Sequence, residues 1–379
     1  MPDVRGALRT SRAGAATGTP EDWRGTARRE ADVIPGPPRS RETPVALGRE
    51  AAPSPAIAQR APDEDGSDGL RRDWHAPVPL SLHRTLLVHR RGPGDPTFRV
   101  DDRGAIWRTS LTPDGPGTLR LTVAKPTMDN SATPDSVLIR AAAWGSGAAC
   151  LLDGVPDLLG AGDDPSAFQP DHPRLRELAR QMPGLRIGRT KRVLEALVPA
   201  VLEQKVVGME AQRAWRRLVS WYGSGAPGPA PSGMRVVPAA ATWLAIPSWD
   251  WHRAGVEAIR ARTIANAASV ADRLETICAL PAAEADRMLR SLPGIGRWTA
   301  AEVRQRACGD PDAVSVGDYH IPALVGWTLA GRITDDAGML ELLAPYAGQR
   351  YRVTRLIELG GQAPPRRGPR MSIRDYRAL

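Results

Sequence analysis

The fold of this chain is decided by the stretch LPGIGRWTA at residues 292–300. Glu284, Met288 and Leu289 precede it with helical spacing, and a second helix-forming run follows at residues 298–308. The proline and the two glycines between these runs are turn-forming residues. The sequence therefore predicts a helix, a tight hairpin and a second helix.

The predicted hairpin has the chemistry of a phosphate-binding turn. Gly294 and Gly296 permit positive φ angles and carry no side chains that would shield the backbone, so consecutive N–H groups at the start of the second helix can face outward. The helix dipole favours anions at that end, and Arg297 adds a positive charge. We therefore expect the hairpin to bind a nucleic-acid backbone, and an ordinary interhelical turn is the alternative.

A family resemblance rests on residues 292–300 together with the tripeptide Gly-Asp-Tyr at residues 317–319. These motifs resemble the helix-hairpin-helix DNA glycosylase superfamily, and most of all its AlkA-type branch, the 3-methyladenine DNA glycosylase II family. The spacing between Trp298 and Asp318 is similar to that of this branch, in which the matching Trp and Asp line the base pocket. The resemblance implies an α+β fold, with an N-terminal antiparallel β-domain followed by an all-α helix-hairpin-helix glycosylase domain.

Composition and periodicity divide the chain into four segments. Residues 1–73 are rich in Arg, Pro, Gly and acidic residues with hardly an aromatic, which predicts a disordered, basic and Pro-rich extension. Residues 74–174 contain short apolar runs between Pro- and Gly-rich turns, as expected of an α+β N-terminal domain. Residues 175–360 have helical spacing and correspond to the glycosylase domain, and residues 361–379 are expected to be a basic flexible tail.

Individual elements can be predicted within the two middle segments. Apolar and β-branched runs predict strands at residues 82–89, 105–111 and 119–123, and a strand or the start of a helix at residues 137–144. In the helical segment, apolar residues within 194–202 recur at i, i+3, i+4, i+7 and i+8. This spacing predicts a helix with one continuous buried stripe.

The charge balance favours a polyanionic partner, because 51 Lys and Arg residues face 42 Asp and Glu residues. The cysteines, Cys150, Cys278 and Cys308, include no Cys-x-x-Cys pair, so we expect no zinc site, iron–sulfur cluster or disulfide framework. The sequence has no apolar leader and no run long enough to span a bilayer. We expect a monomeric, cytoplasmic protein that associates with the nucleoid and not with a membrane.

Asp318 is the candidate catalytic residue. Breaking an N-glycosidic bond builds positive charge on the sugar carbon C1′, and an ionised carboxylate stabilises that charge in the transition state. The same group can orient or deprotonate the attacking water. The alternative is that Asp318 only caps the helix that begins near His320, because Asp is a favoured N-cap residue. The two roles are compatible.

The resemblance also bears on the type of reaction. Relatives with lyase activity present a Lys nucleophile in the corresponding region, whereas no Lys lies between Leu292 and Asp318. Relatives that act on mismatched or oxidised bases often carry a four-cysteine cluster beyond the catalytic Asp, and no Cys follows Cys308. A monofunctional enzyme that uses water is therefore expected.

Trp298, Glu302 and Tyr319 are the expected base-pocket residues. The indole of Trp298 can stack on an extruded cationic purine, and a position in the apolar core is its alternative. Glu302 occupies a place where AlkA-type proteins have an aromatic residue; its carboxylate could accept a hydrogen bond from a purine edge, or it could lie on a solvated helix surface. Ile357 falls where a second tryptophan would be, so the expected aromatic cage is thinner.

Gln204 and Lys205 are expected to contact DNA where the flipped base leaves the stack. The family has Gln at the position of Gln204, whereas Lys205 replaces an apolar wedge with a long cation whose stem can still fill space. A polar helix terminus is the alternative for both residues. The hairpin supplies the other expected DNA contacts, which are Pro293, Gly294, Ile295, Gly296, Arg297 and Thr299.

Only one bound ion is suggested. Hairpins of this family often hold Na+ or K+ on main-chain carbonyls, and Leu292 and Ile295 are the positions that the resemblance implies. The six histidines show no ligand spacing, so we expect no catalytic metal and no other cofactor.

The sequence thus predicts a DNA base-excision repair glycosylase that acts on double-stranded DNA with a damaged base. It would flip an alkylated purine such as 3-methyladenine and hydrolyse its N-glycosidic bond with Asp318. One alternative is a non-catalytic helix-hairpin-helix protein that binds damaged DNA, and another is a glycosylase for a different modified base.

Overall fold

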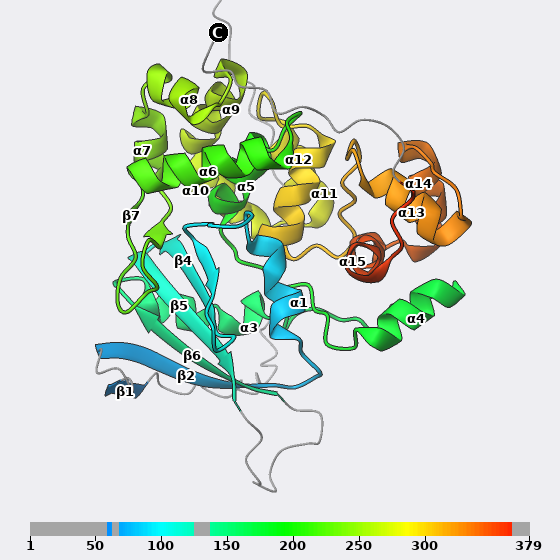
Figure 1. The fold of residues 1–379 in the computed structure, drawn as a ribbon, viewed down its shortest axis with the longest axis horizontal. Helices are drawn as coiled ribbons and strands as arrows, with labels where there is room; N and C mark the ends of the chain where they lie inside the picture. The colour runs from blue at the N-terminus through cyan, green and yellow to red at the C-terminus, as the bar shows by residue number, and fades with distance from the viewer. Residues whose placement is uncertain (1–58, 63–67, 125–136, 366–379) are drawn as a thin grey trace, which may run out of the picture. The chain divides into compact units, whose positions relative to one another are not determined.

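The computed structural model describes residues 59–62, 68–124 and 137–365 (Figure 1). The predicted α+β class is confirmed, because the described residues contain a six-stranded antiparallel sheet and many helices. None of the described helices combines the length and the apolar character that crossing a bilayer requires.

The sheet is built from β1 (Gln59–Pro62), β2 (Asp68–Ala76), β3 (Phe98–Val100), β4 (Ile106–Thr112), β5 (Gly115–Val123) and β6 (Val137–Trp144). Its strand order is β1-β2-β6-β5-β4-β3, and all neighbouring strands are antiparallel. β4 and β5 form a hairpin in which Thr112 pairs with Gly115 across a Pro-Asp turn. The predicted antiparallel arrangement of these strands is therefore confirmed.

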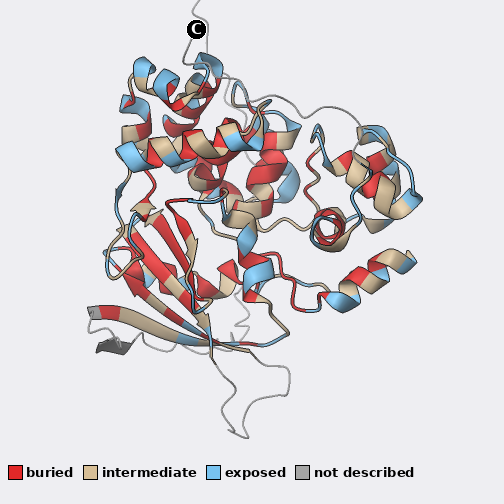
Figure 2. Ribbon diagram, viewed as in Figure 1, coloured by how far each residue is buried: buried red, intermediate tan, exposed pale blue. Residues whose placement is uncertain are grey.

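One face of the sheet is apolar, because side chains alternate along each strand. Leu119 and Ile139 are fully buried on this face, where α1 (Leu82–Leu86), α2 (Ala148–Asp153) and α3 (Val155–Leu158) contribute to the same apolar cluster. Figure 2 shows the buried residues recurring along the central strands. The sheet thus needs helices on one side to bury its apolar face.

The remaining helices follow in chain order. They are α4 (Pro173–Gln181), α5 (Val193–Leu202), α6 (Gly208–Tyr222), α7 (Ala240–Ala245), α8 (Ser248–Ala254), α9 (Ala258–Ala268), α10 (Ala271–Glu275), α11 (Ala282–Arg290), α12 (Arg297–Val303), α13 (Ile321–Ala330), α14 (Asp336–Leu343) and α15 (Arg350–Gly360). A small two-stranded ladder, β7 (Ser224–Gly225) with β8 (Arg235–Val236), follows α6.

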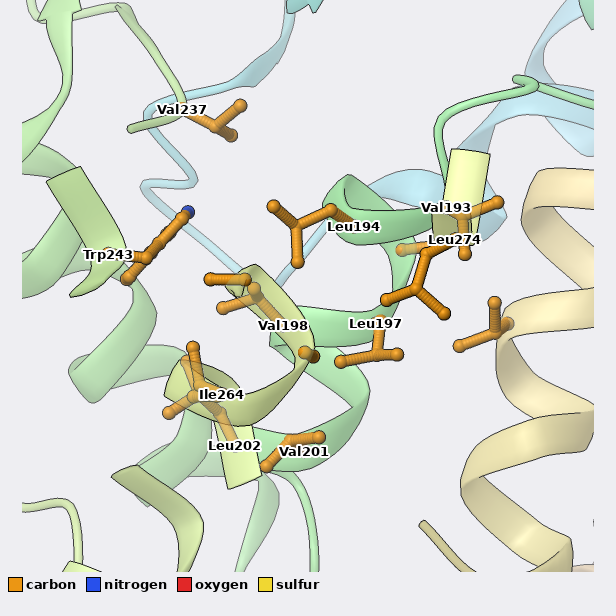
Figure 3. Close-up of a cluster of buried hydrophobic side chains, with 14 of the residues drawn as sticks. Val193, Leu194, Leu197, Val198, Val201, Leu202, Val237, Trp243, Ile264 and Leu274 are labelled. Atoms are coloured by element: carbon orange, nitrogen blue, oxygen red, sulfur yellow. The ribbon is translucent and has the colours of Figure 1, made fainter. Parts of the chain in front are cut away.

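Helix α5 is buried on nearly all sides, as Figure 3 shows for its apolar side chains. Leu197, Val198 and Val201 are at most 1% exposed and belong to the largest apolar cluster, to which Trp243 of α7 and Ile264 of α9 also belong. The predicted stripe within residues 194–202 is confirmed, but burial extends around the whole helix. A helix that is apolar all round belongs in the core of a protein.

A separate apolar cluster joins α4 to the C-terminal helices. Its members include Leu178 of α4, Val325 of α13, Met339 of α14 and Val353 of α15. Ile357, which was expected near a base pocket, is 1% exposed in this cluster. It therefore serves to pack α15.

The strand predictions are partly confirmed. Residues 105–111 and 119–123 lie in β4 and β5, and residues 137–144 form β6. The strand predicted at residues 82–89 is wrong, because this segment forms α1 and a short 3-10 helix, η1 (Leu87–His89). Leu82, Thr85 and Leu86 are its buried residues, and their i, i+3, i+4 spacing is that of a helix face.

The extension predicted at residues 1–73 needs a correction at its C-terminal end. Residues 1–58 and 63–67 lie outside the described residues, but residues 68–73 belong to β2 and pair with β6. Leu70, Arg72 and Trp74 alternate on one face, and Nη1 of Arg72 donates to the Leu152 carbonyl at 3.1 Å. The polar composition of residues 68–73 did not indicate a strand. Arg72 fits into β2 because its guanidinium binds the carbonyl of Leu152 at the end of α2. The boundary between residues 174 and 175 stays a prediction, and most of the predicted tail, residues 366–379, lies outside the described residues.

His89 lines a small cavity together with Arg91, Arg108, Glu195 and Arg306. Burial, followed by the positive charges of the nearby arginines, lowers the pKa of His89 well below its ordinary value of 6.5. Each arginine of the cavity is balanced by a carboxylate, and the pairs are Arg91 with Glu203, Arg108 with Glu195 and Arg306 with Glu302. The folded protein therefore keeps this imidazole neutral.

The neutral state of His89 predicts a loss of stability in mild acid. The unfolded chain takes up a proton on His89 below pH 6.5 that the folded chain does not bind, so this part of the stability is present above pH 6.5 and is lost as the pH falls. Between pH 7.5 and 5.5 the wild type should lose about 1.4 kcal/mol more than a His89→Gln variant, as measured by urea unfolding. Parallel pH profiles for the two proteins would contradict this expectation.

Candidate active site

The predicted helix, hairpin and helix are confirmed, since α11 and α12 are joined by a turn at residues 291–296. The N–H of Ile295 donates to the Leu292 carbonyl at 3.1 Å and closes the turn. Ile295 is buried in the apolar cluster around α5, whereas Pro293 and Arg297 are exposed. One apolar side chain thus anchors a turn that is otherwise largely exposed.

The two glycines of the turn have different roles. Gly294 has a φ of +88°, and a Cβ there would lie 2.2 Å from Oγ1 of Thr263 on α9. Gly296 has a φ of −93°, an ordinary extended value, and a Cβ there would meet no atom within 4 Å. The turn therefore uses positive φ only at Gly294, while Gly296 leaves the approach to α12 open.

The N-terminus of α12 is available to an anion. Its N-cap residue is Gly296, and no side chain of the described residues caps it. The first N–H groups of a helix have no intrahelical partner, and the helix dipole is positive at this end. Arg297 is exposed at the first helical position. This end of the hairpin can therefore hold a phosphate group.

Gln204 ties the end of α5 to the hairpin. Its Nε2 donates to the Gly294 carbonyl at 3.0 Å and to Oγ1 of Thr299 at 2.8 Å. Thr299 is itself only 2% exposed, so it supports the turn from inside. The direct DNA contacts expected of Gln204 and Thr299 stay predictions, and the structure adds a bracing role for both.

Lys205 follows at the exposed corner after α5. It has a φ of +54°, one of two positive φ values among the described non-glycine residues. A left-handed conformation costs an ordinary residue about 1 kcal/mol, and such residues often cluster at functional sites. Lys205 and Gln204 do lie just beyond the C-terminus of α5, as the helix-terminus alternative required.

Asp318 is held by three hydrogen-bond donors. Its Oδ1 accepts from the N–H groups of His320, at 2.7 Å, and Ile321, at 2.9 Å, and its Oδ2 accepts from Nε1 of Trp298 at 3.0 Å. Asp318 thus accepts the first N–H group of α13, which begins at Ile321, although the N-cap position itself is His320. A carboxylate offers about four acceptor positions, so one remains for a water or another donor.

Trp298 and Asp318 are thus brought together from two elements, as their predicted roles require. Trp298 is half-buried in the first turn of α12 and belongs to none of the apolar clusters of the described residues. The alternative of a core tryptophan is not supported, in contrast to Trp215 and Trp243, which lie in the cluster around α5. The loop that delivers Asp318 turns at Gly317, whose φ is +94°.

Sequence comparison gives one informative relative, although no family model matches the chain. The chain is similar to the probable bifunctional transcriptional activator/DNA repair enzyme AlkA of Mycobacterium tuberculosis, with 31% identity over 298 residues. The match covers 74% of this chain and 54% of that protein, so the chain spans about half the length of its relative.

Structural comparison gives the same answer. The 3-methyladenine DNA glycosylase of Archaeoglobus fulgidus has a TM-score of 0.60 at 16% identity, over 76% of this chain and 97% of that one. The chain therefore has the fold of this DNA glycosylase. An 8-oxoguanine glycosylase/lyase of Clostridium acetobutylicum, in complex with double-stranded DNA, has a TM-score of 0.57 at 12% identity, over 80% of this chain and 96% of that one. The resemblance to the superfamily and to its AlkA-type branch is confirmed.

Glu302 is buried, so the alternative of a solvated helix surface is wrong, whereas its base-pocket role stays a prediction. The residue is 7% exposed, accepts a hydrogen bond from Oγ of Ser315 at 2.6 Å and pairs with Arg306 at 2.6 Å. A carboxylate is tolerated in the interior when it is paired and hydrogen-bonded. Glu302 therefore fixes the segment that leads to Asp318 and does not lie on a solvated surface.

Gln305 completes this network from the π-helical turn η3 (Arg304–Cys308). Its Nε2 donates to the Ala313 carbonyl and to Oγ of Ser315, both at 2.8 Å. Sequence reasoning missed Gln305 and Ser315. The one available signal was the i, i+4 spacing of Glu302 and Arg306, which favours an ion pair on a helix.

Tyr319 is placed beside the carboxylate in sequence but does not enclose it. The side chain is 83% exposed, and its ring meets the edge of the His320 ring at a centroid distance of 4.8 Å. Glu302 and Ile357 are both buried in contacts within the protein. Of the residues expected in the pocket, Trp298 is the one whose side chain donates a hydrogen bond to Asp318. The pocket role of Tyr319 stays a prediction.

No set of His, Cys, Asp and Glu side chains in the described part of the chain could hold a metal ion. The cation expected on the carbonyls of Leu292 and Ile295 would use main-chain oxygens instead, and it stays a prediction. The Leu292 carbonyl already accepts the N–H of Ile295, which leaves its second lone pair for an ion.

The same substitution at the two glycines of the hairpin should destabilise the protein to different extents. Gly294→Ala forces a side chain into a left-handed conformation and against Thr263, so it should destabilise the protein by about 2 kcal/mol. Gly296→Ala has space and an ordinary φ, so it should cost less than about 1 kcal/mol, the scale of a helix-cap change. Urea unfolding of both variants measures the difference, and equal costs would contradict it.

Proposed function

We propose that this protein is a monofunctional DNA repair glycosylase that removes an alkylated purine, such as 3-methyladenine, from double-stranded DNA. The observation that carries the proposal is the hydrogen-bonded pair of Asp318 and Trp298 beside an uncapped hairpin helix. The relative from M. tuberculosis is described as a DNA repair enzyme, and the A. fulgidus neighbour as a 3-methyladenine DNA glycosylase. Both descriptions support the proposal.

The chemistry follows from the carboxylate. As the N-glycosidic bond breaks, positive charge develops on C1′, and the ionised Asp318 stabilises it. Its remaining acceptor position orients the water that attacks the same carbon. The three donors that hold Asp318 prevent it from rotating away, so no reorganisation is needed when the charge forms.

Trp298 supplies the recognition of the base. An alkylated purine carries positive charge, and indole is the side chain with the strongest attraction for a cation over its face. Because the N–H of Trp298 is bound to Asp318, the ring plane is fixed relative to the carboxylate. The flipped base would then lie between an electron-rich ring and a negative charge.

The hairpin holds the DNA backbone in this proposal. The free N–H groups of α12 and the exposed Arg297 bind a phosphate, and the bare Gly296 lets it approach. Na+ or K+ on the carbonyls of Leu292 and Ile295 would bridge to the same strand. Lys205, exposed beside the hairpin, would enter the gap left by the flipped base.

Two alternatives remain as outcomes of the experiments. A glycosylase for another modified base is favoured by the burial of Glu302 and Ile357, which removes two expected walls of the alkyl-purine pocket. A non-catalytic protein that binds damaged DNA is the other alternative. In each case we expect a cytoplasmic, nucleoid-associated monomer.

Replacing the carboxylate should abolish base release without unfolding the protein. Asp318→Asn keeps an oxygen that can cap α13 but removes the charge, so the rate of 3-methyladenine release from methylated duplex DNA should fall at least 100-fold, on the scale of one lost electrostatic contact. The assay is single-turnover release of free base, with thermal unfolding as the test of folding.

Asp335→Asn is the matched control. Asp335 caps α14 through the N–H of Gly338 at 3.0 Å, so it has a capping role, while the neighbouring Asp336 is the residue that accepts the N–H of Gly317. It should release base at the wild-type rate. Wild-type release by Asp318→Asn would end the catalytic assignment, and wild-type protein that binds damaged DNA but frees no base from a panel of modified duplexes would favour the non-catalytic alternative.

The absence of a Lys between residues 292 and 318 predicts the nature of the product. The wild type should leave an intact abasic strand, and borohydride should not trap it on DNA, because no amine forms a Schiff base with the sugar. Denaturing electrophoresis reads both results. A borohydride-trapped complex would show that a different amine acts as a nucleophile.

A further inference from the structure

Two cysteines that are distant in sequence meet where the chain enters and leaves the helix-hairpin-helix unit. Cys278 lies in the 3-10 turn η2 (Thr276–Ala279), and Cys308 ends η3. Their sulfur atoms are 2.7 Å apart, and both residues are half-buried. The third cysteine, Cys150, instead accepts a hydrogen bond from Nη2 of Arg192 at 2.9 Å. The chain therefore holds one pair of adjacent thiols and one separate thiol.

The pair occupies a particular place in the helix-hairpin-helix unit. η2 comes before α11 and η3 continues α12, so the two cysteines flank the unit on either side in sequence. η2 and η3 are in contact, and each sulfur packs against the apolar cluster that also contains Ile277, Leu289 and Ala307. A covalent bond at this point would join the segment that enters the unit to the segment that leaves it.

We propose that Cys278 and Cys308 are a redox-active pair that forms a reversible intramolecular disulfide across the helix-hairpin-helix unit. The distance between the sulfurs is already close to the 2.05 Å of a bond, so only a small side-chain movement is required. Partial exposure lets a small oxidant reach them. This property is independent of the proposed glycosylase activity.

The reaction balances with a peroxide as the oxidant. Each thiol loses one hydrogen, an S–S bond forms, the O–O bond of hydrogen peroxide breaks, and two water molecules are released. A dithiol reductant reverses the step by exchange. No other residue has to donate or accept electrons.

The surroundings of Cys278 affect how fast it is oxidised. The hydrogen bond with Cys308, followed by burial, raises the pKa of the Cys278 thiol. Because the thiolate is the reactive species, the raised pKa slows the reaction of Cys278 with an oxidant.

The cross-link should raise the melting temperature. It connects residues separated by 30 positions, which removes conformational freedom from the unfolded chain. For a protein of this size the expected increase is about 5 °C, fully reversed by dithiothreitol. A disulfide formed between two molecules would not give this reversible shift at low protein concentration.

The experiment uses the full chain, reduced, freed of reductant and then treated with hydrogen peroxide. Free thiols should fall from three to one, and non-reducing peptide mass spectrometry should find Cys278 joined to Cys308. In the Cys150→Ser variant free thiols should fall from two to none, with the same Cys278–Cys308 link and the same melting shift as in the wild type, whereas Cys278→Ser and Cys308→Ser should show no melting shift.

Several outcomes would overturn the proposal. Three free thiols after oxidation, a link that involves Cys150, a disulfide-linked dimer on a non-reducing gel, or sulfinic acid at Cys278 would each do so. The wild-type mass spectrum decides the matter even where a serine variant fails to fold. Base release by the reduced protein, measured separately, keeps this result distinct from the test of the glycosylase activity.

Discussion

The burial of α5 is the constraint on which the rest of the structure depends. A helix that is apolar on nearly every side is stable in water only when other elements cover it, and α5 contacts α6, α9, α10 and α12. Two of these neighbours position the hairpin. Thr263 of α9 packs against Gly294, and α12 begins where the turn ends. Gln204, just past the end of α5, then fastens the hairpin by side-chain hydrogen bonds. The hydrophobic requirement of one segment thus positions the hairpin.

Buried charged residues hold the second part of the site, the segment that leads to Asp318. Glu302 and Arg306 neutralise each other in the interior, and Ser315 and Gln305 use the remaining hydrogen-bonding capacity. An unpaired carboxylate at this depth would be costly, so the network has few alternative arrangements. The segment it holds ends at Asp318, which is attached in turn to α13 and to Trp298. The carboxylate is therefore fixed by packing and hydrogen bonds on both sides of the loop.

Much of this arrangement could be predicted from local sequence patterns. The hairpin at residues 292–300, the apolar helix within 194–202 and the pairing of Trp298 with Asp318 depend on short-range spacing or on a family motif. The strand predicted at residues 82–89 is wrong, because a short apolar run fits a strand or a buried helix equally well.

The features that escaped prediction depend on contacts between distant segments. The burial of Glu302 depends on Ser315, and the bracing role of Gln204 depends on Gly294. Neither the spacing of Cys278 and Cys308 nor their neighbours in sequence indicated that the two sulfurs meet. β2 was missed because Arg72 is a poor strand signal unless the carbonyl it binds is known.

The hydrogen bonds of Asp318 also restrict how this protein can evolve. In the proposed function, one side chain both binds the first N–H group of α13 and supplies the reactive charge, so a substitution that removes the charge also disturbs a helix unless the new side chain can still accept at the same point. Glu is a poorer N-cap residue and Ala cannot cap, whereas Asn can. A lineage that lost the reaction but kept the fold for DNA binding would therefore pass most easily through Asn at position 318, and a survey of descendants should find inactive copies that look structurally intact.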